Sequence, residues 1–324
     1  MKSENNELSL IKQLRELTQA GMKDCKDSLT EAIWDLQKAV DLVKKKGLNV
    51  VSGREGKVAA EGIIAIVGAE FNARSSSMIE INCQTDFVSN NDAFKAFAVK
   101  AAMHLAKQNH NDGLGTFDPN DLEEDRKALV STTKENVIIR RWHVENTNSN
   151  TRVFSYIHSN KKIGVLLTLF SLGKISEDEV TELGNDLTMQ VAAMNPIAVK
   201  SNRLPEAVVT RQLAIFEEQL KELNKPQAAW SKIIDGKSRK WHTEVCLLDQ
   251  ESITVPKSSV RQVIKNISDK LGCEITVLNF VRFEVGEGIE VSKSNLADEV
   301  SQMSGVHQHS RQGMSGACKD CPKD

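Results

Sequence analysis

The residues with the clearest chemical potential in this chain are Thr85, Asp86, Phe87 and Val88, which set a carboxylate beside a large aromatic ring. They follow a segment of alternating apolar and polar residues that predicts a strand ending at Cys83. A helix is expected to begin soon after them, because asparagines able to cap it stand at 90 and 91. A corner of this kind is typical of a probe that enters a crevice on another protein. The alternative is a core phenylalanine beside a helix-capping aspartate.

Two other groups of residues have the types needed for enzyme chemistry or metal binding. Cys83 is a candidate thiol nucleophile, although no histidine stands near it in the sequence, and a buried structural thiol is the alternative. His307, His309, Cys318 and Cys321 are suitable ligands for tetrahedral zinc, and the two cysteines are alternatively a redox pair. These four stand in a segment rich in Gly, Ser and Gln, which favours an unstructured tail. We therefore expect no cofactor and no metal.

Motifs of nucleotide-binding proteins and of common hydrolases are missing from the sequence. Residues 53–57 contain glycines and a lysine, but not with the spacing of a phosphate-binding loop, and Val58 follows where a hydroxyl is needed for Mg²⁺. Residues 286–288 lack the third glycine of a dinucleotide fingerprint. Neither H-E-x-x-H nor G-x-S-x-G occurs. We expect a chain that does not bind nucleotide directly and is not an enzyme.

The composition is that of an ordinary globular protein. The chain has 324 residues, enough for two or three compact units, with 27% charged residues and a net charge of −2. This charge and an aromatic content of 5% argue against binding nucleic acid through bulk charge or base stacking. The longest apolar run, 163–170, is too short to span a bilayer, so no membrane association is expected. A polar N-terminal segment and six scattered cysteines indicate a cytoplasmic protein.

The elements that must position the corner can be predicted from apolar spacing. Residues 9–47 are expected to form three short helices, with Gly47 ending the third and a polar linker at 48–58. Two mixed units of similar plan follow. The first has expected strands at 63–67, 78–83 and 137–144 and helices at 91–107 and 122–134. The second has expected strands at 153–156, 163–169 and 275–285 and helices around 180–194 and 260–271.

Two helices interrupt the second mixed unit. Pro205 suits the first turn of one helix, and Pro226 separates it from the next. Together they predict an antiparallel helical hairpin over about 196–235 that protrudes as an interaction element. A short helix is expected at 295–303, followed by a disordered tail.

Several motifs of the sequence resemble those of the translation elongation factor Ts family. LRELTQAGMKDCK at 14–26 resembles the first signature of that family, and EINCQTDFVSN at 80–90 matches the second at every position. Other matches occur in the order of the family, at 59–62, 135–141, 156–158, 163–165 and 280–288. The resemblance extends over about residues 8–303 and does not include the tail.

The resemblance implies an α+β fold with an N-terminal three-helix, ubiquitin-associated-like bundle. A two-part α+β core with an inserted antiparallel helical hairpin and a short C-terminal helical module would follow. The expected divisions are the bundle with its linker at 1–54, the first half of the core at 55–144, the second half at 145–195 and 241–278, the hairpin at 196–240, the C-terminal module at 279–303 and the tail at 304–324.

The resemblance also implies a function. Members of the family are guanine-nucleotide exchange factors for elongation factor Tu in translation elongation. In the family the Thr-Asp-Phe-Val corner wedges into the nucleotide domain of Tu near its Mg²⁺ site, which here implies Thr85, Asp86, Phe87 and Val88. His158 matches a secondary contact position. The expected factor binds Tu with GDP, perturbs the Mg²⁺ and phosphate site, promotes GDP release and stays bound until GTP enters.

Some positions outside the corner depart from the family pattern. These are Gln19, Ser28, Thr133, Lys134, Glu251 and Ser252. Competing interpretations are a ubiquitin-type adaptor using residues 9–47, a thiol or metal enzyme, and a scaffold that binds Tu without altering GDP release. A homodimer formed through the helical hairpin is a further alternative.

Overall fold

The computed structural model describes residues 2–18, 20–68, 75–107, 118–172, 177–223 and 226–290. Two compact units divide the chain, residues 1–288 and residues 289–324, and the architecture below is that of the first. The helix expected at 295–303 and the tail with its histidines and cysteines lie outside the described residues.

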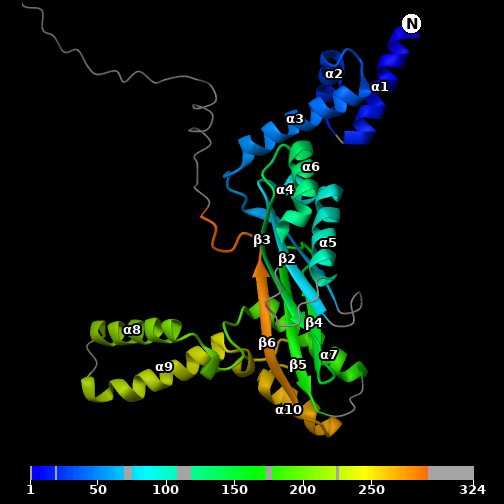
Figure 1. Ribbon diagram of the computed structural model, residues 1–324. Coiled ribbons are helices and arrows are strands. Elements are labelled where there is room, and N and C mark those ends of the chain that lie inside the picture. The colour runs from blue at the N-terminus through cyan, green and yellow to red at the C-terminus, as the bar shows by residue number, and fades with distance from the viewer. Residues whose placement is uncertain are drawn as a thin grey trace, which may run out of the picture. The chain divides into compact units, whose positions relative to one another are not determined.

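An N-terminal bundle of three helices shares one apolar core (Figure 1). Its members are α1 (Lys2–Thr18), α2 (Met22–Glu31) and α3 (Leu36–Arg54). Leu14 and Leu29 are fully buried at its centre. Asp35 begins α3 as its cap, because its carboxylate accepts a hydrogen bond from the N–H of Lys38 at 3.1 Å. The three helices predicted from the sequence are therefore present.

The third helix does not end at Gly47, where a stop was predicted. It continues to Arg54, so most of the expected linker at 48–58 is helical. A Cβ atom at Gly47 would lie only 2.8 Å from Oγ of Ser131, a residue of α6 (Glu123–Thr133). Gly47 therefore lets two helices approach closely within a continuous helix, and this packing role overrides its usual role as a helix terminator.

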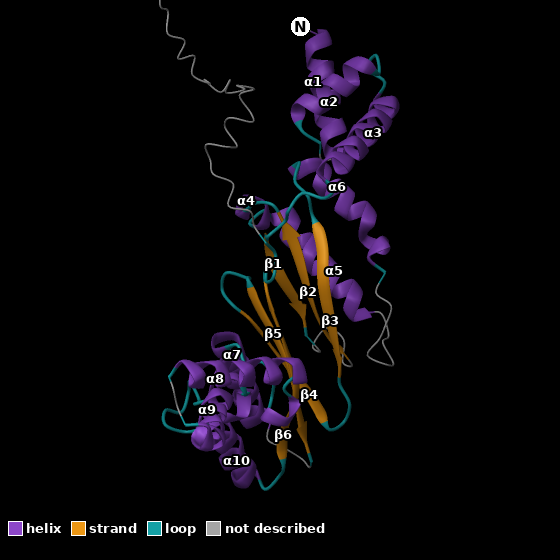
Figure 2. Cartoon of the chain, turned by 90° about the vertical axis from the view of Figure 1, so that its left-hand side faces the viewer, coloured by secondary structure: helices purple, strands orange, loops and turns teal. Residues whose placement is uncertain are grey.

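The first half of the core is an antiparallel sheet with strand order β1-β2-β3. It consists of β1 (Glu61–Val67), β2 (Ser75–Cys83) and β3 (Ile138–Asn146). The helix α5 (Asp92–Lys107) covers one face (Figure 2). Ile79 and Ile81 of β2 share a core with Phe94 and Ala98 of α5. Each predicted strand and helix of this unit is confirmed, with its ends shifted by a few residues.

The second half of the core is another antiparallel sheet, with order β4-β5-β6. It consists of β4 (Thr151–Ile157), β5 (Ile163–Ser171) and β6 (Ile275–Glu284). The helices α7 (Glu177–Met194) and α10 (Val260–Leu271) pack on it. Val165 and Leu167 share their core with Leu183 and Leu187 of α7.

The other faces of the two sheets meet in a separate apolar cluster. Ile64 and Met78 of the first sheet pack there with Leu166 and Phe283 of the second. The approach is close at Gly164, where an added Cβ would lie 2.5 Å from Cγ2 of Ile64. This contact explains why both faces of β2 and most of β5 are buried.

The two helices expected between α7 and α10 are α8 (Glu206–Glu222) and α9 (Trp230–Val245), which lie side by side (Figure 1). Phe216 and Leu220 are the buried residues of α8. The ammonium group of Lys237 from α9 lies 5.4 Å from the centre of the Phe216 ring. Apolar packing of α8 and a cation–π contact therefore join the pair.

Candidate functional site

The Thr-Asp-Phe-Val segment forms a tight corner between β2 and α5. Asp86 begins α4 (Asp86–Ser89), a single helical turn that Thr85 caps with its hydroxyl, which accepts a hydrogen bond from the N–H of Val88 at 3.4 Å. The Asn91 side chain then accepts from the N–H of Ala93 at 2.8 Å and starts α5. The predicted strand, corner and asparagine cap are confirmed, and α4 is an additional turn between them.

The corner presents its aromatic ring to solvent. Phe87 is 84% exposed, and Asp86 beside it is also exposed. Val88 packs partly against the core shared by β2 and α5, and Ser89 is buried. The alternative of a core phenylalanine is therefore wrong, because Val88 and Ser89 anchor the turn while Phe87 projects from it.

The strand that leads to the corner rests on a buried charge. Glu80 is fully buried, and its carboxylate pairs with Arg140 at 2.8 Å and with Arg141 at 2.5 Å. It also accepts a hydrogen bond from the N–H of Gly286 at 2.9 Å. Burial raises the pKa of Glu80, but these three hydrogen bonds outweigh it, so the pKa lies below its ordinary value. The charged network fixes β2 against β3 and the segment that follows β6.

Cys83, the last residue of β2, has the properties of a structural thiol. It is buried, and its Sγ lies 3.1 Å from the carbonyl oxygen of Thr85, to which it donates a hydrogen bond. Burial, together with the charges of Glu135 and Glu61, raises the pKa of the thiol to about 12. A reactive cysteine needs a thiolate, so the interpretation as a nucleophile is not supported.

His158 lies at the same end of the core as the corner. It is exposed at the turn between β4 and β5, and its Nδ1 lies 3.0 Å from the hydroxyl of Tyr156. The same turn contacts β1, because Lys162 forms an ion pair with Glu61 at 2.7 Å. Glu61 is the register partner of Cys83, directly before the corner.

One residue beside the corner was given no role in the sequence analysis. Glu135 accepts hydrogen bonds from Gln84 and Thr85 although it stands about 50 residues later in the chain. Spacing along the sequence gives no signal for such a contact, because the return of the chain to the end of β2 is a tertiary feature. The antiparallel pairing of β2 with β3 brings the two segments together.

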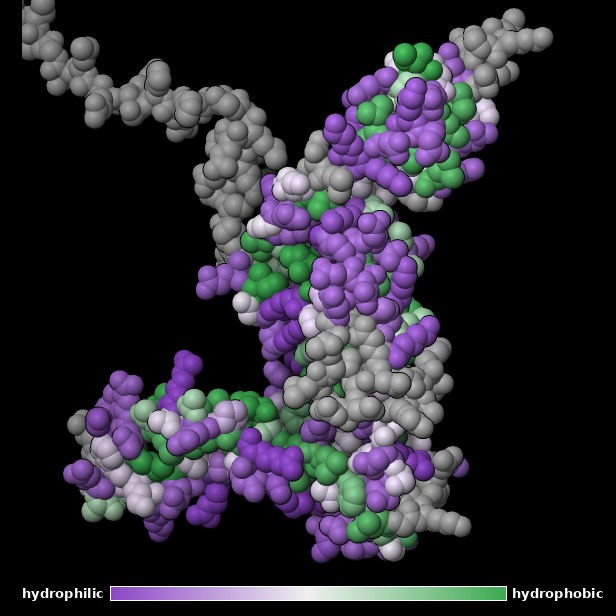
Figure 3. Space-filling model, in the orientation of Figure 1, coloured by the Kyte–Doolittle hydropathy of each residue, from purple (hydrophilic) through white to green (hydrophobic). Residues whose placement is uncertain are grey.

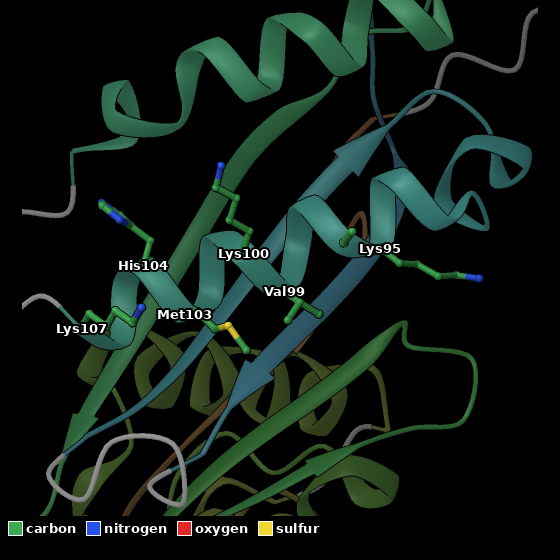
Figure 4. Close-up of a pocket in the computed structure, with 7 residues that line it drawn as sticks. Lys95, Val99, Lys100, Met103, His104 and Lys107 are labelled. Carbon is green, nitrogen blue, oxygen red and sulfur yellow. The ribbon is translucent and has the colours of Figure 1, made fainter. Parts of the chain in front are cut away.

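A groove of about 570 Å³ lies elsewhere, along the outer side of α5. Val99 and Met103 project from one side of the helix and Lys100 and His104 from another (Figure 4). Lys100 pairs with an aspartate at 2.6 Å and His104 with another at 3.0 Å. Two of the polar side chains that line the groove are therefore already paired within the protein.

The described residues contain no group of three or more His, Cys, Asp or Glu side chains placed to hold a metal ion. His307, His309, Cys318 and Cys321, the alternative zinc ligands named from the sequence, lie outside the described residues. Among the helices that the structure describes, none is long and apolar enough to cross a membrane.

Comparisons with known proteins give a consistent result. The protein family described as Elongation factor TS matches residues 84–287. Elongation factor Ts of Clostridium acetobutylicum is 36% identical over 300 residues, which cover 91% of this chain and 97% of that protein. Elongation factor Ts of Clostridioides difficile is 37% identical over 304 residues, covering 90% and 97%. The protein of that name from Bdellovibrio bacteriovorus is 35% identical over 305 residues, covering 92% and 98%.

The two-sheet α+β core and these similarities place the chain in the class of translation elongation factors. Within this class, the chain belongs to the elongation factor Ts family. Its members are nucleotide exchange factors for elongation factor Tu in translation elongation and catalyse no covalent reaction. The family assigned from the sequence motifs is therefore confirmed.

Proposed function

We propose that this chain promotes GDP release from elongation factor Tu by inserting the corner formed by Thr85, Asp86, Phe87 and Val88 near the Mg²⁺ and phosphate site of Tu. The observation that carries the proposal is the 84% exposure of Phe87 on a capped and anchored turn. A large aromatic ring held in water by its own scaffold is a suitable anchor for a pocket on a partner.

An exchange factor of this kind acts by differential binding. It must bind nucleotide-free Tu more tightly than Tu with nucleotide, and by linkage each ligand then weakens the other by the same factor. Contacts that exist only when the phosphate and Mg²⁺ site is distorted supply that difference. The factor stays bound to nucleotide-free Tu until GTP enters.

Phe87 meets this requirement because its burial stabilises only the complex. Transfer of the ring from water into a crevice contributes about 1.5–3 kcal/mol. The free energy is available only when elements of Tu part to admit the ring, so it favours the distorted state.

Asp86 supplies the polar part of the same contact. Its exposed carboxylate can compete for hydrogen-bond donors that orient the water ligands of the Mg²⁺ ion in Tu. Loss of this support weakens Mg²⁺ binding, and the phosphate charge of GDP is then less compensated. GDP dissociates faster as a result.

Other parts of the chain extend the docking surface in this proposal. His158 makes a secondary contact, since its turn is joined to β1 next to the corner. The bundle α1–α3 serves as a ubiquitin-associated-like domain that adds contact area. The cytoplasm is the proposed location, as the site of translation elongation.

The helices α8 and α9 form the proposed antiparallel hairpin inserted in the second half of the core. Hydrophobic side chains gather along these helices on the face in Figure 3. This apolar surface supports a contact with another chain, and a homodimer is one such arrangement. The domain boundaries stated from the sequence, with the hairpin at 196–240, stay predictions.

The decisive experiment is release of fluorescent GDP from Tu, with the wild type and with the Asp86→Ala/Phe87→Ala variant. The wild type should accelerate release, and the variant, with an unchanged circular dichroism spectrum and melting temperature, should not. Equal losses of folding and of exchange in the variant would contradict the proposal. A wild type that binds Tu without changing release would indicate a scaffold instead.

A further inference from the structure

The carboxylate of Glu135, from a distant part of the chain, binds the residues that lead into the corner. Oε2 of Glu135 accepts hydrogen bonds from the backbone N–H of Gln84 at 3.1 Å and of Thr85 at 3.0 Å. Oε1 accepts a hydrogen bond from the Thr85 hydroxyl at 2.6 Å. Hydrogen bonds to an ionised carboxylate are stronger than those between neutral groups. Three of them meet at the two residues that connect β2 to α4.

The surrounding chain fixes the position of this carboxylate. Lys134 ends α6 in the left-handed conformation, with φ of 60°, and so turns the chain sharply before Glu135. Asn136 then donates its N–H to Oε1 of Gln84 at 3.1 Å and its Nδ2–H to the carbonyl of Lys57 at 2.8 Å. Gln84 therefore donates to Glu135 and accepts from Asn136, which closes a reciprocal pair of contacts.

The corner needs such support because α4 is a single turn of four residues. A turn of this length is not stable by itself in water. Its exposed Phe87 adds almost no packing to the free protein. The Thr85 hydroxyl links Glu135 directly to this turn, because the same oxygen that donates to Glu135 also accepts from Val88.

We propose that Glu135 is a positioning residue for nucleotide exchange: by holding Gln84 and Thr85, it keeps Asp86 and Phe87 in the orientation that enters the partner. This inference rests on the proposed function of the corner. Glu135 itself needs no contact with the partner. Its effect comes from preorganisation, since a corner already in its bound shape loses less conformational freedom on docking.

The test uses the full chain and measures GDP release from Tu with Glu135→Gln, alone and combined with Phe87→Ala. Glutamine has nearly the same shape, but it has no charge and only one oxygen to accept hydrogen bonds. We expect Glu135→Gln to slow stimulated release about 10-fold, the loss expected for hydrogen bonds to a charged group. In the Phe87→Ala background the same change should alter release by less than about 2-fold, because residues acting through one contact are not additive.

Glu123→Gln is the matched control. Glu123 lies at the start of α6 and binds Arg126 through two hydrogen bonds, at 2.6 and 2.7 Å, without touching the corner. The Glu123→Gln substitution should lower the melting temperature. At a temperature where all variants are folded, it should leave stimulated GDP release unchanged. A merely structural role for Glu135 predicts the same behaviour as this control, and that outcome would overturn the inference.

The outcomes separate the two proposals. If Tu releases GDP as fast with Phe87→Ala as with wild type, the proposed function of the corner fails. Suppose instead that stimulated release is slow with Phe87→Ala but as fast with Glu135→Gln as with wild type. Then only the positioning role fails. The same conclusion follows if the fold-losses of the two single variants multiply in the double variant. Should Glu135→Gln not fold, Thr85→Val replaces it in the cycle. That variant removes the 2.6 Å hydrogen bond to Glu135 together with the cap on Val88 N–H, and it should give an equally non-additive loss.

Discussion

Two turns in the described part of the chain expose a large hydrophobic side chain almost completely, and they are built differently. Phe87 is 84% exposed and Ile33, between α2 and α3, is 87% exposed. The turn of Ile33 is held by backbone bonds within itself, such as the one from Trp34 N–H to the Leu29 carbonyl at 2.7 Å. The corner of Phe87 has such backbone bonds as well, for example from Asn90 N–H to the Asp86 carbonyl at 3.0 Å, but it is also held by Glu135, which comes from another part of the chain.

The two turns also differ in backbone strain. Ile33 and Trp34 both have positive φ values, 55° and 62°, which are unfavourable for residues with bulky side chains and most of all for a β-branched one. Phe87 lies in a regular helical turn. Exposure of a hydrophobic residue is therefore a poor guide to a binding site by itself. Anchoring by a distant residue distinguishes the corner, the site proposed above, from the turn of Ile33, which is a strained connection.

The largest effect is expected on the stability of the protein, at Glu80, the buried charge in the strand that leads to the corner. Glu80→Gln should lower the free energy of unfolding by about 3 kcal/mol, because it leaves Arg140 and Arg141 without their buried partner. Urea denaturation at neutral pH measures this loss.

The pH dependence provides a check on Glu80. Its pKa is lowered in the folded protein, so its contribution is present above the ordinary glutamate value of about 4.3 and is lost as the pH falls through the folded pKa. The difference in stability between wild type and Glu80→Gln should therefore shrink in acid. A difference that stays constant down to the acid transition would argue against the charge as its cause.

The next largest effect is expected in the GDP release assay, where variants of the two exposed residues can be compared directly. Phe87→Ala should slow stimulated release by about 10- to 100-fold, which corresponds to the loss of 1.5–3 kcal/mol of ring burial in the complex. Ile33→Ala removes a side chain of similar exposure and should change release far less, because the bundle α1–α3 is proposed to add contact area and not the exchange contact itself. A comparable loss with Ile33→Ala would mean that both turns touch the partner, and the contrast drawn above would be wrong.

The smallest effect is expected for a substitution at Ile33, measured as a change in the free energy of unfolding. Ile33→Asn should raise the free energy of unfolding by about 1 kcal/mol, because asparagine tolerates the left-handed conformation far better than isoleucine does. Thermal unfolding of the two proteins gives the comparison. A lower melting temperature for Ile33→Asn would show that the isoleucine side chain contributes packing that outweighs the strain.

The sequence predicted the elements around the corner well, because local chemistry determines them. Alternation located β2, and asparagine capping located the start of α5. The same alternation placed Glu80 and Asn82 on one face of β2 without showing what covers that face. The second sheet covers it, and both residues are buried, with the amide atoms of Asn82 making no hydrogen bond in the described structure.

Long-range packing explains the parts that the sequence did not predict. Gly47 has the local signature of a helix end, but its contact with α6 is a tertiary feature. Glu135 looks like an ordinary polar residue after a helix until the return of the chain brings it to Gln84 and Thr85. For the corner, the residue types indicated an interaction site, and the structure was needed to show that Phe87 points into solvent.

The close approach at Gly164 has a mechanical consequence. With only a hydrogen atom at this position, the backbone of β5 lies directly against Ile64, so the two sheets have almost no room to slide past one another. Gly164 is the register partner of Ile157, next to the turn that carries His158. A displacement of that turn should therefore displace β1 as well, because the two strands are in direct contact.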